Sequence, residues 1–471
     1  MGKATKLYVL MGVFLAICAA AFAASHYQQK KEHIKTSGEV ILEIPADSVT
    51  ALSWTNETGT FSFTKNEEWT YDDDAAFPVS ADKIRELLSQ FEALSAAFAI
   101  DEVTDYAQYG LDEPICTVSV TAGGESYTIK LGDFSKMDGQ RYISIGDDKV
   151  YLAVHDPLEE FDAVLRDMIR NDSIPEFDTA EQITFTGEEN YTILREEDRK
   201  SLCEDDVFFT EGKPLDTDSV DALVSGIQSL NLSSYVSYHV SQEELAAFGL
   251  LEPDLTIRLT YGTRDTDGNV TDTGELLLET SRNPQEAAAY DAAVEAEAEE
   301  LPEVTHYVRV GQSQIVYEIS ESAYYRLTQV SYDTLRHQTL FTADFDTVTA
   351  IDVALNGENC TFTYTPPEDQ AEADAEGTWT YGEEEFNIYR LKTAFCAISA
   401  SAFTEQTPSG REEISLTVHL DNADFPTFTL ALYRLDGTDC IACVDGKPTA
   451  LVSRSKTVDL IEAVNELILA A

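Results

Sequence analysis

The stretch Tyr109-Gly110-Leu111-Asp112-Glu113-Pro114 guides the interpretation of this chain, because a close variant, Phe248-Gly249-Leu250-Leu251-Glu252-Pro253, recurs later in it. The pattern predicts a short helical turn that ends at a glycine with positive φ. The leucine that follows is expected to enter the core, and the proline to begin a strand where no N–H is needed. No ligand is required to explain the motif. Its recurrence indicates repeated structural units.

The residues around the first copy predict strands with two helices between and after them. Val49–Trp54 and Thr60–Thr64 form an expected hairpin, and Trp69–Tyr71 a third short strand. A helix is expected after Ser80, a good N-cap residue, because apolar residues then recur at helical spacing. Four further strands and a closing helix are predicted at Cys116–Val120, Tyr127–Leu131, Arg141–Ile145, Val150–Val154 and Pro157–Met168.

The same order of elements is expected twice more. It restarts near Gln182, where Val207–Phe209 takes the place of the tryptophan strand. It restarts again near Thr347, where Trp379-Thr380-Tyr381 repeats Trp69-Thr70-Tyr71 residue for residue. The third copy has lost the Gly-Leu-x-x-Pro motif. Sequential strands with few helices predict an α+β fold in which each module is an antiparallel sheet with helices packed on one face.

These patterns predict the domain organisation. Residues 1–36 form a membrane anchor or signal with a linker, and three modules follow at 40–172, 178–338 and 345–471. The second module carries an acidic insertion at 284–303, expected to be an exposed helix or a disordered loop. Residues 264–274 and 366–377 are expected to lengthen hairpins.

The N-terminal segment has the form of a membrane-targeting sequence. Lys3 and Lys6 precede an apolar run from Leu7 to Ala24, which would rise about 27 Å as a helix. A transmembrane helix that stays in place, with the rest of the chain extracytoplasmic, is the leading expectation. The alternative is a secretory signal cleaved near Ala21-Phe22-Ala23, which would release the protein.

The charge of the chain bears on its partners. With 86 acidic and 31 basic residues, the formal net charge is −55. A polyanion repels nucleic acid and anionic lipid headgroups, so nucleic-acid binding is excluded from the expected functions. The simplest explanation of the charge is that acidic side chains keep an exposed surface soluble. The alternative is that they bind cations or a basic partner.

One segment has the oxygen-rich composition of a calcium site. Asp265, Asp267, Asn269 and Asp272 surround Gly268, in a pattern that partly matches a calcium-binding loop. Strands rather than helices are expected on both sides, and Asp-Gly is also the usual sequence of a β-turn. The sequence is compatible with two interpretations, a calcium site formed by these residues and a plain β-turn. No other cofactor is expected.

The remaining motifs that could carry chemistry have simpler structural explanations. Cys440-Ile-Ala-Cys443 has CxxC spacing but lies in a predicted strand, so buried single thiols are expected, with disulfides as the alternative. Ser80-x-x-Lys83 and Ser453-x-x-Lys456 match a catalytic serine–lysine pattern but lie at helix starts, where serine caps. The seven histidines are scattered, and no catalytic residue is predicted.

The features that carry a family resemblance are the anchor, the hairpin, the Trp-x-(Tyr/Phe) strand, the (Tyr/Phe)-Gly-Leu-x-x-Pro motif, and Gly132, Tyr142 and Tyr151. Through these features the chain resembles the domain of unknown function 4340 family. The resemblance is best over 45–170 and weakest over 346–471. It implies a bacterial envelope protein, in some cases encoded beside ABC-type export components related to gliding motility. It supplies no catalytic residues.

The expected function is therefore a non-enzymatic, membrane-anchored interaction or scaffold protein, accessory to an ABC-type transport complex or to other envelope proteins. Two alternatives remain. One is an envelope protein that binds a small ligand, a glycan or a cation. The other is a hydrolase whose carboxylate pair is hidden among the many acidic residues.

Overall fold

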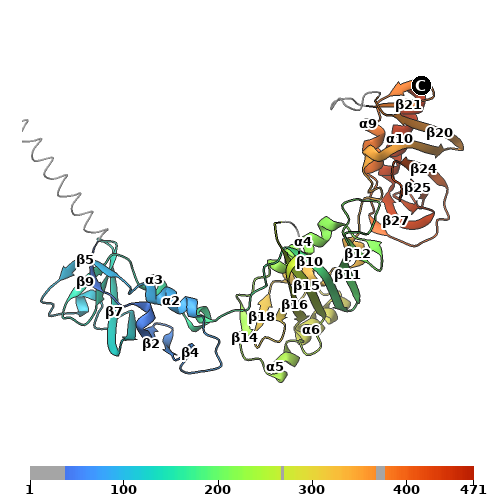
Figure 1. Cartoon of the computed structure of the whole chain (residues 1–471). Helices are drawn as coiled ribbons and strands as arrows, with labels where there is room; N and C mark the ends of the chain where they lie inside the picture. Colours follow the sequence, from blue (N-terminus) through green and yellow to red (C-terminus); the bar gives the residue numbers. More distant parts are fainter. Residues whose placement is uncertain (1–37, 267–269, 368–376, 471) are drawn as a thin grey trace, which may run out of the picture. The chain divides into compact units, whose positions relative to one another are not determined.

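The computed structural model describes residues 38–266, 270–367 and 377–470 (Figure 1). The predicted anchor at 1–36 lies outside these residues, and among the described helices none is both long and apolar enough to cross a membrane. The chain divides into two compact units. One runs up to Asp172 and includes Tyr235–Val240, and the other contains Ser173–Ser234 and everything from Ser241 onward.

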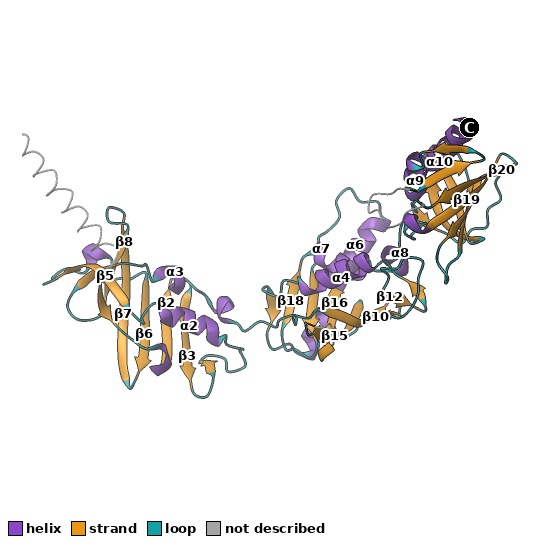
Figure 2. Ribbon diagram, turned by 45° about the horizontal axis from the view of Figure 1, so that its top comes forward, coloured by secondary structure: helices purple, strands orange, loops and turns teal. Residues whose placement is uncertain are grey.

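Three antiparallel sheets form the framework, each with nine strands (Figure 2). The first has the order β1-β5-β9-β8-β7-β6-β2-β3-β4. Its strands are β1 Glu39–Leu42, β2 Val49–Asn56, β3 Gly59–Lys65, β4 Trp69–Tyr71, β5 Leu94–Ile100, β6 Cys116–Ala122, β7 Glu125–Ser135, β8 Gln140–Ser144 and β9 Val150–Ala153.

The second sheet has the order β13-β12-β11-β10-β15-β16-β17-β18-β14. Its strands are β10 Thr179–Gly187, β11 Tyr191–Arg195, β12 Phe208–Thr210, β13 Lys213–Pro214, β14 Tyr235–Ser237, β15 Leu255–Arg264, β16 Val270–Arg282, β17 His306–Val310 and β18 Val316–Ile319.

The third sheet has the order β22-β21-β20-β19-β24-β25-β26-β27-β23. Its strands are β19 Val348–Leu355, β20 Glu358–Thr365, β21 Thr378–Tyr381, β22 Glu384–Phe386, β23 Ala402–Phe403, β24 Glu412–Leu420, β25 Thr427–Arg434, β26 Asp439–Val444 and β27 Lys447–Ser453.

The helices are fewer and mostly short. The α-helices are α2 Ala81–Ser89, α3 Leu158–Phe161, α4 Thr217–Gln228, α5 Gln242–Ala247, α6 Pro284–Glu295, α7 Glu321–Thr328, α8 Tyr332–Leu335, α9 Tyr389–Cys396 and α10 Arg454–Ala470. The 3₁₀ turns are η1 Ala46–Ser48, η2 Ala107–Tyr109, η3 Leu165–Met168 and η4 Phe345–Thr347.

The three sheets share one topology, which confirms the predicted repetition. Eight strands occur in the same spatial order in each sheet. The strand that contains Trp69 (β4), the strand that contains Phe208 (β12) and the strand that contains Trp379 (β21) hold equivalent places. The predicted mixture of antiparallel sheets and a few helices is therefore correct.

Each core lies between the sheet and helices packed on it. In the first module the buried rings of Trp54 and Phe91 contact Phe161 of α3, at centroid distances of 6.0 and 5.3 Å. In the third, α10 contacts β24, β26 and β27, and contributes the fully buried Leu460 and Val464. Burial of these apolar surfaces is the main force that holds helix to sheet.

The Gly-Leu-x-x-Pro motif has the predicted structural role. Gly110 follows η2 with φ 68°, and Gly249 ends the helical turn after α5 with φ 75°. Leu111 and Leu250 are 1% and 3% exposed, so both enter the core. Beside Gly110 the chain passes so closely that an added Cβ would lie 2.7 Å from the Asp133 carboxyl carbon.

Some predicted elements differ from those observed. The closing helix expected at Pro157–Met168 is two short pieces, α3 and η3. The indole of Trp54 donates to the Ala163 carbonyl at 3.0 Å, and the Asn56 amide donates to the Phe161 carbonyl at 3.2 Å. Side chains of β2 thus take the carbonyl groups that a continuous helix would use.

Strand β5 is absent from the predicted elements, because Leu94 also continues the helical spacing of the apolar residues after Ser80. Its Ala-rich sequence has low strand propensity, and pairing with β1 and β9 decides its conformation. In the second module, part of the acidic insertion is the helix α6, which Asn283 caps by accepting from the Gln285 and Glu286 N–H groups. Ser80 caps α2 as predicted.

Candidate functional site

The sheet face opposite the core carries short polar side chains in the first module. Trp54, Val118 and Ile129 are buried, and the residues between them along the strands point to the other face. There Ser62, Ser53, Ser119 and Thr128 lie side by side on four neighbouring strands, and each remains partly or fully exposed. We call this row and its equivalents the hydroxyl face.

Equivalent rows on the other two sheets contain hydroxyl groups together with other side chains. In the third module it consists of Thr361, Asp352, Thr417 and Thr429 on adjacent strands. Asp352 accepts a hydrogen bond from Thr361 at 2.6 Å and lies 2.7 Å from Nε2 of His419. In the second module the equivalent row is Thr192, Thr184, Arg258 and Leu277. Each row therefore consists mainly of groups that form hydrogen bonds, with Leu277 as the apolar exception.

A cleft of about 490 Å³ opens in the second module. Asp254 and Arg282 line it together with the aromatic side chains of Phe185, Tyr191 and Tyr324. The Tyr324 hydroxyl donates to Asp254 at 2.7 Å, and the Arg282 guanidinium lies 3.5 Å from the same carboxylate. Burial and this hydrogen bond raise the pKa of Tyr324, so the phenol stays protonated. The wall is thus polar and already internally hydrogen bonded.

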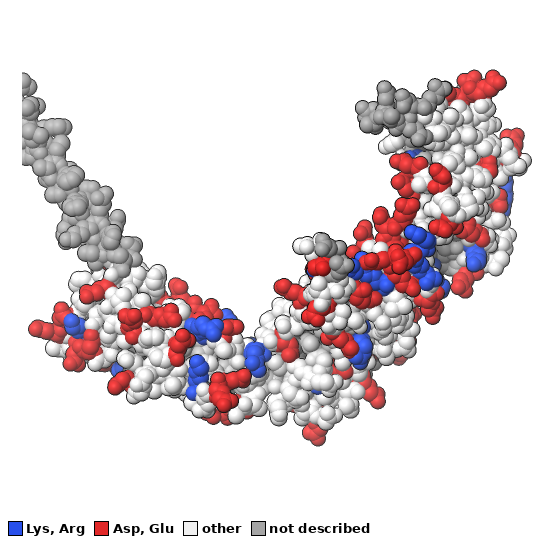
Figure 3. Space-filling view, in the orientation of Figure 1, with Lys and Arg blue, Asp and Glu red and all other residues white. Residues whose placement is uncertain are grey.

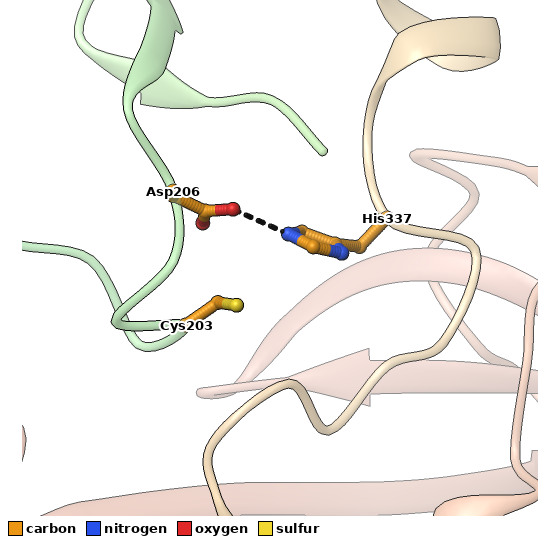
Figure 4. A group of neighbouring side chains, drawn as sticks. All are labelled: Cys203, Asp206 and His337. Atoms are coloured by element: carbon orange, nitrogen blue, oxygen red, sulfur yellow. Dashed lines mark hydrogen bonds and ion pairs between the residues drawn. The ribbon is translucent and has the colours of Figure 1, made fainter. Parts of the chain in front are cut away.

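A second polar cluster lies elsewhere in this module and joins Cys203, Asp206 and His337 (Figure 4). Cys203 and Asp206 occupy one turn between β11 and β12, in which the Asp206 N–H donates to the Cys203 carbonyl at 3.2 Å. His337 follows α8. Its Nε2 lies 2.7 Å from Oδ1 of Asp206, and the sulfur, nitrogen and oxygen atoms all lie within 4.8 Å of one another.

Backbone and hydroxyl contacts fix the segments that carry this cluster. The Thr217 hydroxyl donates to the Asp205 carbonyl at 2.9 Å and accepts from the Val207 N–H at 3.1 Å. The Asp216 N–H donates to the Leu335 carbonyl at 2.9 Å, which places the segment after α8 beside the start of α4. The turn and His337 are therefore both held against the N-terminus of α4.

The electrostatics of the cluster argue against a nucleophilic thiol. Burial raises the pKa of Cys203, and the carboxylates of Asp206, Asp205 and Asp216 raise it further. A hydrogen bond from the Asp205 N–H lowers the pKa but does not offset these effects. Burial alone would lower the pKa of His337, but the hydrogen bond to Asp206 and nearby acidic charges raise it overall. Because a nucleophilic cysteine needs a lowered pKa, this cluster does not fit thiol catalysis.

The predicted calcium residues are only partly described. Asp267 and Asn269 lie outside the described residues. Asp265 is exposed at the end of β15, and Asp272 is an exposed residue of β16 paired with Thr263. Within the described parts of the chain, the group of side chains close enough to share a metal ion is Cys203, Asp206 and His337 instead. Calcium at the hairpin remains a prediction.

The other cysteines are free thiols, and the first serine–lysine motif forms a helix cap. The six cysteines after residue 37 are free thiols, and Cys440 and Cys443 are both buried in β26. Lys83 donates to Glu86 at 2.7 Å, and this hydrogen bond raises the pKa of Lys83. A general-base lysine needs a lowered pKa, so the shift of Lys83 is opposite to the one required, and Ser80 has the predicted role as the cap of α2.

Sequence reasoning missed the Cys203–Asp206–His337 cluster. The histidine lies 131 residues after the aspartate, and no motif links them. A Cys-x-x-Asp pair in a polar loop was the available signal, because residues i and i+3 of a turn approach one another. A pair this short carries little information in a chain with 86 acidic residues.

Comparison with known families adds one result. The profile of the family described as Domain of unknown function (DUF4340) matches residues 69–253 and 209–417. The matches begin in β4 and β12, the equivalent strands of two modules, so each runs from one module into the next. No curated protein and no solved structure shows significant similarity. Since the two matches together cover most of its 471 residues, the chain belongs to the DUF4340 family.

Proposed function

We propose that this protein is a non-enzymatic interaction protein of the cell envelope. In this proposal, residues 1–36 hold it at the membrane with its modules outside the cytoplasm, where it works beside an ABC-type transport complex. The observation that carries the proposal is an exposed row at equivalent strands of three sheets of the same topology. The row is all hydroxyl in the first module, contains Asp352 among threonines in the third, and contains Arg258 and Leu277 beside two threonines in the second. Repeated modules with equivalent exposed faces are typical of proteins that bind extended or multiple partners.

The charge of the surface favours a protein partner. Asp and Glu side chains are spread over the visible surface and Lys and Arg side chains are sparse (Figure 3). This distribution disfavours nucleic acid and anionic lipid headgroups, and it favours partners with basic segments. Short hydroxyl side chains lose little conformational entropy on binding, so a flat row of them suits a protein surface.

The buried titratable residues support the part of the proposal that gives the protein no enzymatic activity. Burial raises the pKa of the thiols of Cys116 and Cys203, so neither is a ready nucleophile. Burial also raises the pKa of Glu279, but this residue lies 3.6 Å from Arg309 and outside the cleft.

Glu188, Glu189 and Asp254 do line the cleft. Asp254, however, already accepts a hydrogen bond from Tyr324 and lies 3.5 Å from Arg282. A hydrolase of the expected type would need two carboxylates there with separated pKa values, one of them free to donate a proton.

Site-specific photo-crosslinking in cells tests the proposal. A photoreactive residue at Ser119 or Thr417, on the hydroxyl faces of the first and third modules, is expected to capture an integral membrane protein of a transport complex. The same residue at Asp148, in an exposed loop away from these faces, serves as the control. Equal capture from all three positions, or capture of no membrane protein from the two faces, would contradict it.

Membrane attachment has its own test. The full chain should sediment with membranes and resist extraction by high pH, and a chain that lacks residues 1–36 should not. Protease added outside intact cells with a permeabilised wall should digest the modules. Release of the full chain by high salt would instead indicate peripheral binding.

The cleft supports a second candidate function, binding of a glycan or another small polar ligand. Phe185 and Tyr191 stack with centroids 4.7 Å apart at its edge, and Asp254 and Arg282 offer an acceptor and donors. Calorimetric titration with envelope glycan fragments and with calcium tests this. Binding that Tyr191→Leu weakens and Tyr127→Leu leaves unchanged would favour this function, and no heat from any ligand would remove it.

A further inference from the structure

We propose that Cys203, Asp206 and His337 bind one Zn²⁺ ion in the second module. The three ligand atoms are a sulfur, an imidazole nitrogen and a carboxylate oxygen, the three donor types that zinc accepts in proteins. This assignment differs from the calcium hypothesis in residues, in metal and in location. It is independent of the proposed interaction function.

The distances suit a tetrahedral ion. Zinc bonds of about 2.0–2.3 Å place neighbouring ligand atoms about 3.3–3.8 Å apart. The observed separations range from the 2.7 Å hydrogen bond between His337 and Asp206 up to a limit of 4.8 Å. Small side-chain rotations therefore convert the hydrogen-bonded arrangement into a coordinating one. Zinc would displace the proton that His337 and Asp206 share and the thiol proton of Cys203, and both protons would pass to solvent. A water molecule would complete the coordination.

The surroundings supply the outer contacts of a metal site. The second oxygen of Asp206 accepts a hydrogen bond from Ser201 at 2.6 Å, which orients the carboxylate. On the other side of the imidazole, Nδ1 of His337 lies 3.9 Å from Oδ1 of Asp216. A metal-bound histidine commonly directs its second nitrogen toward a carboxylate, which sets its tautomer. At 3.9 Å this is proximity and not a hydrogen bond, and Asp216 would take the positioning role by moving about 1 Å closer when the metal binds.

Burial and the fixed backbone add to the case. The Asp206 side chain is 1% exposed and the His337 side chain is 23% exposed, so the cluster is largely enclosed. The Thr217 and Asp216 contacts hold both ligand-bearing segments without any metal. A preformed site binds metal without a large ordering cost, unlike a site that must fold around the ion.

The donor set selects the class of metal. Calcium and magnesium require mainly oxygen ligands, and a thiol and an imidazole are poor ligands for them. A thiolate with an imidazole favours zinc and similar transition metals. The carboxylates of Asp205, Asp206 and Asp216 surround Cys203 and give the local negative charge that attracts a divalent cation.

Zinc would fasten the start of the segment that enters the third module. His337 lies three residues before Leu340, which is part of the core of that module. Coordination would tie this stretch to the β11–β12 turn. We therefore expect zinc to slow amide hydrogen exchange at residues 201–207 and 335–339. Exchange in the hairpin around residues 264–274, where calcium is predicted, should not change.

Zinc titration of the reduced full chain tests the proposal, with excess Mg²⁺ present to occupy exposed carboxylates. We expect one tight site per chain. Cys203→Ser and His337→Gln should each weaken it by more than 100-fold, and Asp216→Asn by about 10–100-fold. Matched controls are Cys360→Ser, another half-buried thiol, and His419→Gln, another histidine paired with an aspartate. Both controls should bind as the wild type does.

Two results would overturn the proposal. One is the absence of a tight site in the wild-type chain, and the other is tight binding that survives in Cys203→Ser. If the variants unfold, Co²⁺ titration of the wild-type chain still tests the proposal. Co²⁺ bound at this site must show a sulfur-to-cobalt charge-transfer band and tetrahedral visible absorption. Co²⁺ bound without that band, or zinc protection from exchange at segments other than those named, would refute it.

Discussion

The ring of Tyr109 packs against the ring of Tyr142, with centroids 4.9 Å apart. In the second module Phe248 and Tyr307 form the same contact at 4.7 Å. Each pair joins the residue before the motif glycine to the strand β8 or β17, which are equivalent in the two sheets. The third module has neither the motif nor an aromatic residue in the equivalent strand β26, so the motif and the aromatic contact occur in the same two modules.

The aromatic pair predicts a measurable coupling. Tyr109→Leu and Tyr142→Leu should each destabilise the first module, and the double variant should lose less than their sum, by about 0.5–1.5 kcal/mol. Urea denaturation followed by Trp54 and Trp69 fluorescence, in a Trp379→Phe background, reports on this module alone, since the chain has three tryptophans. Additive losses would show that the rings contribute only through buried area.

Gly110 is predicted to be irreplaceable for two reasons, positive φ and lack of space. Gly110→Ala would place a Cβ 2.9 Å from the Asp133 backbone nitrogen. Gly123 has a similar φ, 60°, but no atom within 4 Å of an added Cβ, so Gly123→Ala measures the conformational cost alone. That cost should be about 1 kcal/mol. Gly110→Ala should cost clearly more in the same fluorescence assay, and equal losses would rule out the steric contribution.

The buried ion pair of Arg141 and Asp156 predicts a large effect from one substitution. Arg141 donates to Asp156 at 2.7 Å and to the Gly132 carbonyl at 2.6 Å, and both side chains are at least 86% buried. Arg141→Ala leaves an unpaired buried carboxylate and should destabilise the module by about 3–5 kcal/mol. Lys149→Ala removes a partner from the exposed pair with Asp101 and should change little.

The third module should lose stability in acid through Asp352. Hydrogen bonds from Thr361 and then from His419 lower the pKa of Asp352 in the folded state. A lowered pKa contributes stability above the unfolded value of about 3.9, and this stability is lost as the pH falls through the folded value. Asp352→Asn should therefore reduce the loss of unfolding free energy that the third module shows as the pH falls. Trp379 fluorescence in a Trp54→Phe, Trp69→Phe background measures this pH dependence. An unchanged pH dependence would contradict this.

Much of the fold could be predicted because its signals are local. Alternating strands, the Ser80 cap and the glycine motif each depend on residues a few positions apart. The repetition then made the assignment of three sheets secure, because the same elements recur in the same order. Strand β5 and the broken helix at α3 and η3 escaped prediction, since their conformation depends on distant partners such as β9 and Trp54.

The sequence by itself determined the acidic charge, the repeated modules and the family, since composition and short-range periodicity encode them. The tertiary structure alone decided which polar residues meet. It brings His337 to Asp206 across 131 residues and aligns Ser53 with Ser119 on neighbouring strands. Side-chain proximity of this kind follows from chain topology and strand register, and a linear pattern contains neither.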